Sequence, residues 1–402
     1  MEKTYVLNYW WSANYGALLT AYALNSVLKD FGRNPWLVFN ADKTTLGIES
    51  VYDFQQNFAK EQFNFTKRMK TFEDLKSLNE DSKTFVVGSD QVFRPIYNKS
   101  LWDSFLLGFA KDDAKRIAFS ASFGVDKEQF LNENSKADVE RLKNALNCFD
   151  YVSVREKSGV DLCREVFGVE AQVVIDPVFV VDRAKFDELI ETESEEFDNK
   201  IVSYFLDGNE EKSKACLYLA KKYGCDVVEL CNSNAPVGEW LRAVKQCKML
   251  ITDSFHGMCF AIIFNKPFIC LANRERGFSR FESVLELLEI ENKCVNSVEE
   301  MYSDGAVFEP DYERVNANIE RQRTFALEFL TRALNSEGKN AEEKQRYQTL
   351  YLKDLAMELD KKASLKYQLR YEVWSFCAVV FNKYFPAFLK KWIRGLRARL
   401  GC

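Results

Sequence analysis

Apolar residues along the chain alternate between short runs typical of β-strands and longer stretches with helical spacing. The first run covers residues 4–9, and residues 17–31 follow it with an apolar helical stripe that includes Leu18, Leu19 and Leu28. Gly32 then supplies a stop signal for the helix. This succession of strand, turn and helix is the unit from which parallel α/β sheets are built.

The same alternation continues through the first half of the chain. It predicts strands at residues 36–39, 84–87, 116–122, 151–154 and 172–175, and a helix at residues 137–148. Residues 41–83 are aromatic and charged without clear periodicity, and we interpret them as short helices and loops. Phenylalanines in this stretch either line an acceptor cleft or form a small satellite core, which is the favoured alternative: Phe54, Phe58, Phe63 and Phe65.

An acidic stretch at residues 191–199 is typical of a solvated linker and precedes a second alternating region. That region predicts strands at residues 201–206, 226–230, 249–252 and 267–271, and helices at residues 211–223, 237–246 and 258–264. We therefore predict an α/β fold with two Rossmann-like domains, residues 1–190 and residues 200–335, and a helical tail at residues 336–402. Two such domains imply a ligand cleft between them.

The overall composition is that of a globular protein and argues against several classes of function. Of the 402 residues 47% are hydrophobic and 29% charged, and the net charge of −5 gives no reason to expect nucleic-acid binding. The 11 cysteines include no Cys-x-x-Cys pair, and only one histidine is present, so we expect reduced thiols and no metal. The sequence also contains no recognisable signal peptide or spanning segment, so the expected location is the cytoplasm.

The single histidine, His256, lies where a predicted buried strand gives way to an apolar helix. Parallel sheets bind ligands at the carboxyl ends of their strands, beside helix N-termini that attract anions. A histidine there can transfer protons near neutral pH, or donate a hydrogen bond to a phosphate or carboxylate. It can equally serve the structure alone, as a helix cap or as a turn residue.

Seven short motifs stand along the chain, several of them just after predicted strands. They are Asn-Tyr-Gly at residues 14–16, Val-Gly-Ser-Asp-Gln-Val-Phe at 87–93, Ser-Val-Arg-Glu-Lys-Ser at 153–158, Asp-Pro at 176–177, Thr-Asp-Ser-Phe-His-Gly at 252–257, Phe-Asn-Lys-Pro-Phe at 264–268 and Ser-Arg-Phe-Glu-Ser at 279–283. In this order they resemble the polysaccharide pyruvyl transferase family, over residues 4–295. The resemblance implies a GT-B-like arrangement of two Rossmann-type halves, with the acceptor on residues 1–190 and the phosphoenolpyruvate donor on residues 200–335. It also implies transfer of pyruvate from phosphoenolpyruvate, as co-substrate and without another cofactor, onto two sugar hydroxyls as a cyclic ketal.

One motif departs from the family pattern. Many members carry Ser-Arg-Leu-His-Gly at residues 253–257, so Ser254 here stands in place of an arginine. The donor phosphate still needs cationic partners, and arginine binds phosphate and carboxylate groups bidentately. The candidates are Arg155 and Arg280, which match family positions, and Arg274 and Arg276, which are chosen for their proximity to Arg280. A surface ion pair is the alternative role for Arg155.

We expect His256 and Asp90 to be the catalytic residues. Asp90 follows Gly88 at a strand end, where its carboxylate accepts hydrogen bonds from sugar hydroxyls or takes a proton, or else caps a helix. The same alternative, substrate contact or cap and tight turn, applies to Asn14 and Gly16. The full set of expected substrate-binding residues is Arg155, Arg280, Ser254, Phe255, Gly257, Asn14, Gly16, Gln91, Arg274 and Arg276.

The last segment, Ser364 to Cys402, differs from the acidic body of the chain because it is basic and aromatic. After Pro386 its apolar side chains, from Phe388 to Leu400, fall on one helical face, and Lys and Arg cover much of the rest. A basic amphipathic helix of this kind predicts peripheral binding to an anionic membrane, at the inner face of the cytoplasmic membrane. Packing against the chain's own domain or a partner subunit is the alternative.

The expected acceptor is a sugar of a bacterial surface polysaccharide precursor, such as capsule or exopolysaccharide, carried on a polyprenyl diphosphate lipid. Two other functions stay open, because fold alone does not determine chemistry. One is a nucleotide-sugar-dependent GT-B glycosyltransferase, and the other is a non-catalytic scaffold of a glycan assembly complex. The sequence leaves the oligomeric state open.

Overall fold

The computed structural model describes residues 2–10, 14–39, 53–98, 102–190, 194–230, 235–272, 277–291 and 293–361. The chain divides into two compact units, residues 1–348 and residues 349–402, and both sheets belong to the first unit. Arg274, Arg276 and the predicted membrane-binding segment at residues 364–402 lie outside the described residues. The expectations for them stay predictions.

The first half of the chain contributes a seven-stranded sheet within the described residues, and its neighbouring strands pair in parallel. The strands are β1 (Lys3–Leu7), β2 (Asn34–Leu37), β3 (Asn64–Phe65), β4 (Thr84–Val87), β5 (Lys115–Ala121), β6 (Tyr151–Val154) and β7 (Gln172–Val173). Their spatial order is β3-β2-β1-β4-β5-β6-β7, which reverses between β1 and β4. Open α/β sheets bind ligands at such a reversal, beyond the carboxyl ends of the strands.

Helices lie in the connections between these strands and after β7. They are α1 (Tyr15–Asp30), α2 (Asp53–Gln62), α3 (Phe72–Lys76), α4 (Pro95–Asn98), α5 (Trp102–Phe105), α6 (Lys127–Glu133), α7 (Lys136–Asn147), α8 (Lys157–Leu162), α9 (Pro177–Val180) and α10 (Ala184–Asp187).

Helix α1 is buried along most of its length because both halves of the protein pack on it. Asn14 begins the helix, since its side-chain oxygen accepts a hydrogen bond from the Gly16 N–H, one of the free donors of the first turn. Tyr15 stacks on Trp240 of the second half, with ring centroids 5.2 Å apart, and its hydroxyl donates to the Ala235 carbonyl oxygen. The start of α1, which follows β1 in the chain, therefore contacts the second half of the protein.

The second half contributes a four-stranded parallel sheet within the described residues, in the order β11-β10-β8-β9. Its strands are β8 (Ile201–Tyr204), β9 (Val227–Glu229), β10 (Met249–Thr252) and β11 (Phe268–Cys270). Its helices are α11 (Glu210–Tyr223), α12 (Val237–Gln246), α13 (Phe255–Ile263) and α14 (Ser279–Leu287). Here the strand order reverses between β8 and β10.

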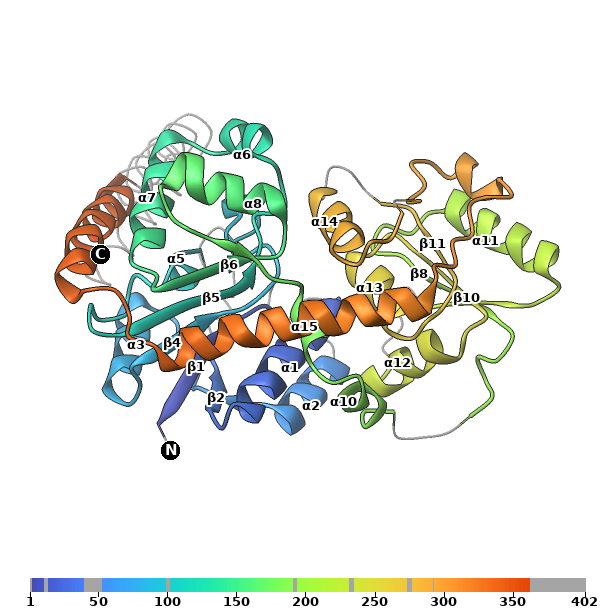
Figure 1. The fold of residues 1–402 in the computed structure, drawn as a ribbon, viewed down its shortest axis with the longest axis horizontal. Coiled ribbons are helices and arrows are strands. Elements are labelled where there is room, and N and C mark those ends of the chain that lie inside the picture. Colours follow the sequence, from blue (N-terminus) through green and yellow to red (C-terminus); the bar gives the residue numbers. More distant parts are fainter. Residues whose placement is uncertain are drawn as a thin grey trace, which may run out of the picture. The chain divides into compact units, whose positions relative to one another are not determined.

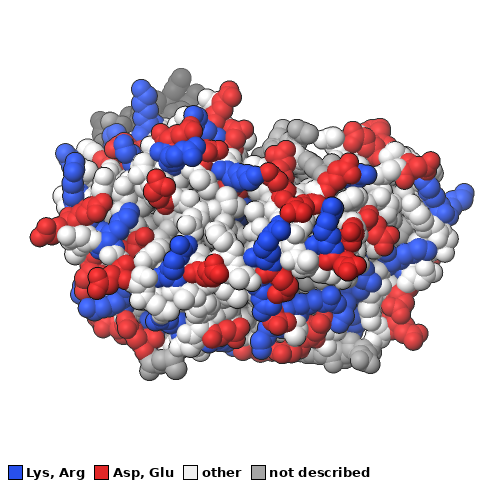
Figure 2. All heavy atoms as spheres, viewed as in Figure 1, with Lys and Arg blue, Asp and Glu red and all other residues white. Residues whose placement is uncertain are grey.

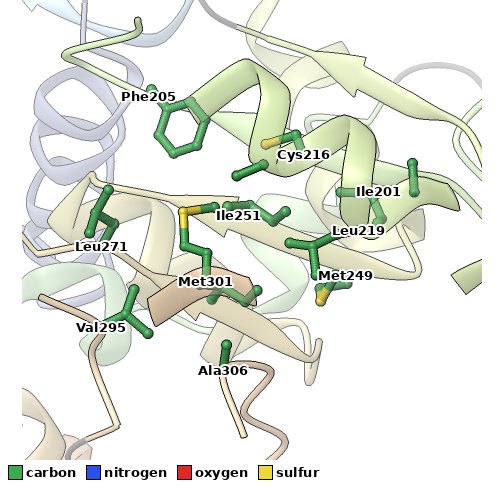
Figure 3. Close-up of a cluster of buried hydrophobic side chains, with 13 residues drawn as sticks. Ile201, Phe205, Cys216, Leu219, Met249, Ile251, Leu271, Val295, Met301 and Ala306 are labelled. Atoms are coloured by element: carbon green, nitrogen blue, oxygen red, sulfur yellow. The ribbon is translucent and has the colours of Figure 1, made fainter. Parts of the chain in front are cut away.

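An apolar cluster covers one face of this second sheet. Figure 3 shows Met249 and Ile251 of β10 packed together with Leu219 of α11 and with Met301. Successive residues of a strand point to opposite faces of the sheet, so Met249 and Ile251, two positions apart, point to the same face and reach the same cluster. Burial of each large apolar side chain contributes about 1.5–3 kcal/mol to stability.

Helix α15 (Tyr312–Asn335) runs from the second half back to the first (Figure 1). Near its start the Asn318 amide donates to the Leu288 carbonyl oxygen, which lies just after α14. Near its end Phe329 contacts Phe119 of β5, with ring centroids 6.2 Å apart. The two sheets are therefore connected twice, by the segment between β7 and β8 and by α15.

The α/β architecture with two Rossmann-like sheets is confirmed, although several predicted bounds are shifted by one to three residues and one strand was missed. Strand β3 forms at Asn64–Phe65 in a stretch predicted to hold only helices and loops, because it extends the sheet edge beside β2. Helix α13 begins at Phe255 and not at residue 258, because Ser254 caps it, and His256 therefore lies in its first turn. Phe58 and Phe63 are buried with their rings 6.3 Å apart, as in the satellite-core alternative.

The surface carries charges of both signs. On the face seen in Figure 2, Lys and Arg side chains are interspersed with Asp and Glu. Among the helices that the structure describes, none combines the length and the apolar character needed to cross a membrane.

Candidate active site

Buried polar side chains gather at the reversal point of the first sheet. Asn8 follows β1 and is 1% exposed, and neither atom of its amide hydrogen-bonds to a described residue. Gly88, just after β4, makes room for it, since a Cβ at Gly88 would lie 2.9 Å from the Asn8 Cγ atom. The Asn8 side chain can therefore still donate a hydrogen bond to a ligand or to water, and accept one from it.

Asp90, two residues after Gly88, is held as an ionised carboxylate at the end of β4. Its φ of 82° is a left-handed conformation that non-glycine residues rarely adopt. Its Oδ1 atom accepts a hydrogen bond from Arg155 Nη2 at 3.1 Å and lies 4.0 Å from Arg280 Nη1. Burial would raise the pKa of Asp90, but the charges of Arg155, His256 and Arg280 outweigh burial and lower it. The next helix begins only at Pro95, so Asp90 is not a helix cap.

Arg155 follows β6 and is completely buried, which excludes the surface ion pair as its role. Its Nη1 donates to Asp176 Oδ2 at 2.8 Å, and its Nη2 donates to Asp90. Burial would lower the pKa of Arg155, but Asp90, Asp176 and Glu156 outweigh burial and raise it. Both terminal nitrogens of Arg155 therefore bind carboxylates of the protein itself.

Asp176 is also completely buried, between Arg155 and the second half. Its Oδ2 accepts a hydrogen bond from Ser89 Oγ at 2.9 Å and lies 3.5 Å from His256 Nε2. Its Oδ1 accepts from the Val178 N–H at 3.2 Å and so caps α9. Burial would raise the pKa of Asp176, but hydrogen bonds and charges from His256 and Arg155 hold it well below its usual range.

His256 comes from the second half and is 2% exposed. Its Nε2 lies 2.8 Å from the Thr20 hydroxyl of α1, in addition to its contact with Asp176. Gly16 of α1 packs directly on the ring, since a Cβ at Gly16 would lie 2.3 Å from His256 Nδ1. A glycine is needed here because only a residue without a side chain lets the helix approach the imidazole this closely.

The Phe255 ring contacts two guanidinium groups. Its ring centroid is 4.7 Å from Arg155 Cζ and 5.3 Å from Arg280 Cζ, distances at which arginine is attracted to an aromatic face. Arg280 Nε donates to the Gly277 carbonyl oxygen at 3.1 Å. Gly277, with φ of 96°, approaches Gly124 of the first half so closely that a Cβ would lie 2.0 Å from the Gly124 carbonyl oxygen. Arg280 is therefore positioned where the two halves meet.

Four of the expected substrate-binding residues have defined local contacts. Ser254 caps α13 by accepting from the Gly257 N–H at 3.3 Å, and a Cβ at Gly257 would lie 2.4 Å from Thr252 Oγ1. Asn14 caps α1 and also accepts from the Tyr204 hydroxyl at 3.4 Å. The Gln91 side-chain oxygen accepts from Arg94 Nη1 at 2.9 Å. Their substrate contacts stay predictions.

The reversal point of the second sheet is occupied by a buried ion pair. Lys212 Nζ lies 2.7 Å from Asp253 Oδ2, and the two side chains are 9% and 2% exposed. Asp253 also accepts from the Leu206 N–H at 2.6 Å and from the Asp207 N–H at 3.1 Å. The pair thus fastens the loop after β8 to the end of β10. Within the described parts of the chain, no group of three His, Cys, Asp or Glu side chains is arranged to hold a metal ion.

Three residues that contact the candidate catalytic residues or their partners were not identified from the sequence. Asp176 had a signal, since it stands in the Asp-Pro motif, but no role was assigned to it. Thr20 and Ser89 gave weaker signals, because a polar residue within a buried helix or at a strand end most often serves local structure. Their significance comes from contacts with residues far away in the sequence, such as that of Thr20 with His256, at a sequence separation of 236.

A profile of the polysaccharide pyruvyl transferase family matches residues 14–275 of the chain, which include nearly all the residues described above. No curated protein matches the chain at a significant level of sequence similarity.

Several solved structures are similar in overall fold. UDP-GlcNAc 2-epimerase from Neisseria meningitidis bound to UDP-GlcNAc aligns with 89% of this chain and 100% of its own, at 10% identity and a TM-score of 0.49. The S. aureus MnaA–UDP structure aligns with 86% of this chain and 95% of its own, at 12% identity and a TM-score of 0.49. The spinosyn rhamnosyltransferase SpnG aligns with 87% and 100%, at 9% identity and a TM-score of 0.42. Similarity at this level says nothing about activity.

Proposed function

We propose that this chain, which belongs to the polysaccharide pyruvyl transferase family, transfers pyruvate from phosphoenolpyruvate onto two hydroxyls of one sugar. The product is a cyclic ketal, and phosphate is released. One observation carries the proposal. His256 and Arg280 of the second half meet carboxylates of the first half, with His256 Nε2 3.5 Å from Asp176 Oδ2 and Arg280 Nη1 4.0 Å from Asp90 Oδ1.

The reaction needs proton transfer and stabilisation of negative charge. The methylene carbon of phosphoenolpyruvate gains a proton and becomes a methyl group, and the adjacent carbon then bonds to the first hydroxyl oxygen. The second hydroxyl oxygen displaces phosphate from that carbon. Of the two protons that the hydroxyls lose, one replaces the proton given to the methyl group and the other leaves with phosphate. General acid–base groups and fixed cations are the groups that accelerate such steps.

The geometry supports a division of roles among the residues. Arg280 is the candidate cation for the donor, because it lies where the halves meet and arginine binds planar anions bidentately. Arg155 acts through Asp90, because both of its terminal nitrogens are bound to carboxylates. Asp90 accepts a proton or a hydrogen bond from a sugar hydroxyl. His256 is the proton shuttle, or else donates a hydrogen bond to the departing phosphate.

Release of phosphate from phosphoenolpyruvate, measured with a synthetic lipid-linked glycan, tests the proposed donor. Mass spectrometry of the glycan should show a gain of pyruvate minus water. His256→Gln should lower turnover by about 10²–10⁴-fold, the range for loss of a general acid or base. Lys214→Gln, at a side chain that is 66% exposed, is the control and should keep wild-type turnover. Consumption of a nucleotide sugar with no phosphate released from phosphoenolpyruvate would overturn the proposal in favour of glycosyl transfer.

We further propose that the acceptor is a lipid-linked precursor of a bacterial surface polysaccharide, at the inner face of the cytoplasmic membrane. The basic, aromatic segment at residues 364–402 supports this on its sequence pattern. Flotation of the full chain with vesicles that contain anionic lipid is the test, and vesicles of neutral lipid are the control. Reversal of charge at Lys390 and Arg394 should reduce flotation with the anionic vesicles, and flotation equal to wild type would dismiss the membrane contact.

A further inference from the structure

One carboxylate oxygen, Asp176 Oδ2, contacts three side chains of the candidate active site. Asp176 Oδ2 lies 2.9 Å from Ser89 Oγ, 2.8 Å from Arg155 Nη1 and 3.5 Å from His256 Nε2. The first two contacts are with its own half of the protein, and the third is with α13 of the second half. Asp176 is therefore placed to determine how the imidazole is oriented and which of its nitrogens bears a hydrogen.

The hydrogen-bonding capacity of these groups restricts the imidazole. Asp176 is ionised, because hydrogen bonds and charges from His256 and Arg155 lower its pKa against the opposing effect of burial. An ionised carboxylate only accepts hydrogen bonds, so a lone pair on His256 Nε2 would face another lone pair. The Thr20 hydroxyl, 2.8 Å from the same nitrogen, can accept as well as donate, so it is compatible with a hydrogen on Nε2.

We propose that Asp176 is a positioning residue that keeps a hydrogen on Nε2 of His256, so that Nδ1 is the nitrogen that gains and loses the catalytic proton. In histidine sites the hydrogen bond at one ring nitrogen determines the state of the other. Nδ1 lies beside Gly16, in the first turn of α1. The catalytic part of this inference rests on the proposed function, whereas the tautomer does not depend on the reaction.

Nitrogen NMR of the histidine ring tests the tautomer directly. His256 is the only histidine of the chain, so full-length protein labelled with ¹⁵N-histidine, and made without a histidine tag, gives the signals of a single imidazole. The neutral ring should bear its hydrogen on Nε2, and the proton that exchanges during titration should be the one on Nδ1. A neutral ring with its hydrogen on Nδ1 would overturn the inference, and this measurement needs no variant.

Two nearly isosteric variants distinguish the effect of Asp176 on the tautomer from the effect of the Thr20 hydroxyl. Asp176→Asn should lower the ratio of the Nε2–H to the Nδ1–H tautomer by about tenfold or more, because it removes the acceptor-only group. Thr20→Val removes the hydroxyl but keeps the carboxylate, so the Nε2–H tautomer should persist. Reversal of the tautomer in Thr20→Val, or an unchanged tautomer ratio in Asp176→Asn, would show that Asp176 does not have this role.

Kinetics connect the tautomer to catalysis. Asp176→Asn should lower kcat by about 10²–10³-fold and change KM for phosphoenolpyruvate by less than about threefold, because a residue that positions the imidazole acts on the chemical step and not on donor binding. A loss confined to KM would contradict the positioning role. If the wild type releases no phosphate from phosphoenolpyruvate, the proposed function fails, and the tautomer measurement still decides the role of Asp176.

Discussion

Replacement of Gly16 by alanine should displace His256 and lower turnover by about two orders of magnitude. A Cβ at this position would lie 2.3 Å from Cγ and from Nδ1 of the imidazole and 2.4 Å from its Cβ, whereas ordinary contacts begin near 3.4 Å. One of these atoms is His256 Cβ, which rotation of the side chain cannot move away. The residue or helix α1 must therefore shift by about 1 Å. A misplacement of about 1 Å in catalytic geometry can cost about 10²-fold in rate.

The same substitution should change stability much less than activity. Alanine is favoured over glycine within a helix by up to about 1 kcal/mol. Overpacking of a buried site costs about 1–3 kcal/mol, so the two effects partly cancel. The free energy of unfolding of Gly16→Ala should therefore fall by no more than about 2 kcal/mol, and the variant should remain folded.

The assay combines three measurements on the same protein. Turnover is measured as phosphate release from phosphoenolpyruvate, stability by urea denaturation, and the imidazole by its ¹⁵N signals. Gly305→Ala is the matched control, since a Cβ there has no neighbouring atom within 4 Å. Wild-type kcat together with unchanged imidazole signals in Gly16→Ala would refute the close packing of α1 on His256.

Two further predictions concern buried carboxylates and are read by urea denaturation. Lys212→Met should lower the free energy of unfolding by about 3–5 kcal/mol, because it leaves the Asp253 carboxylate buried without its cation. Exposed Lys214→Met should change it by less than about 0.5 kcal/mol, and equal losses would contradict the ion pair's role. The folded-state pKa of Asp176 is lowered, so its stabilising contribution is present above its unfolded pKa of about 3.9 and is lost as pH falls below that value. Between about pH 4 and 2.5, stability should therefore fall more steeply in the wild type than in Asp176→Asn, and parallel curves would show that this carboxylate is not responsible.

The sequence by itself determined the succession of strands and helices and the place of the main polar residues along them. Periods of two and of 3.6 residues are local properties, which is why β4, β6, β10 and α12 have their predicted bounds. The carboxyl ends of parallel strands lie on one edge of a sheet, so Asp90 and Arg155 could be expected at the same edge before any contact was known. The departure at Ser254 was also visible in the sequence alone.

Only the tertiary structure decided which partner each of these residues has. Arg155 could have been a surface residue, but neighbouring strands bury it between Asp90 and Asp176. The contact of His256 with Thr20 depends on α1 packing on α13, which no pattern within either helix specifies. Local periodicity tells which face of an element is apolar, and it does not tell which distant element covers that face. The contacts of the lone imidazole therefore depend on which distant helix covers it.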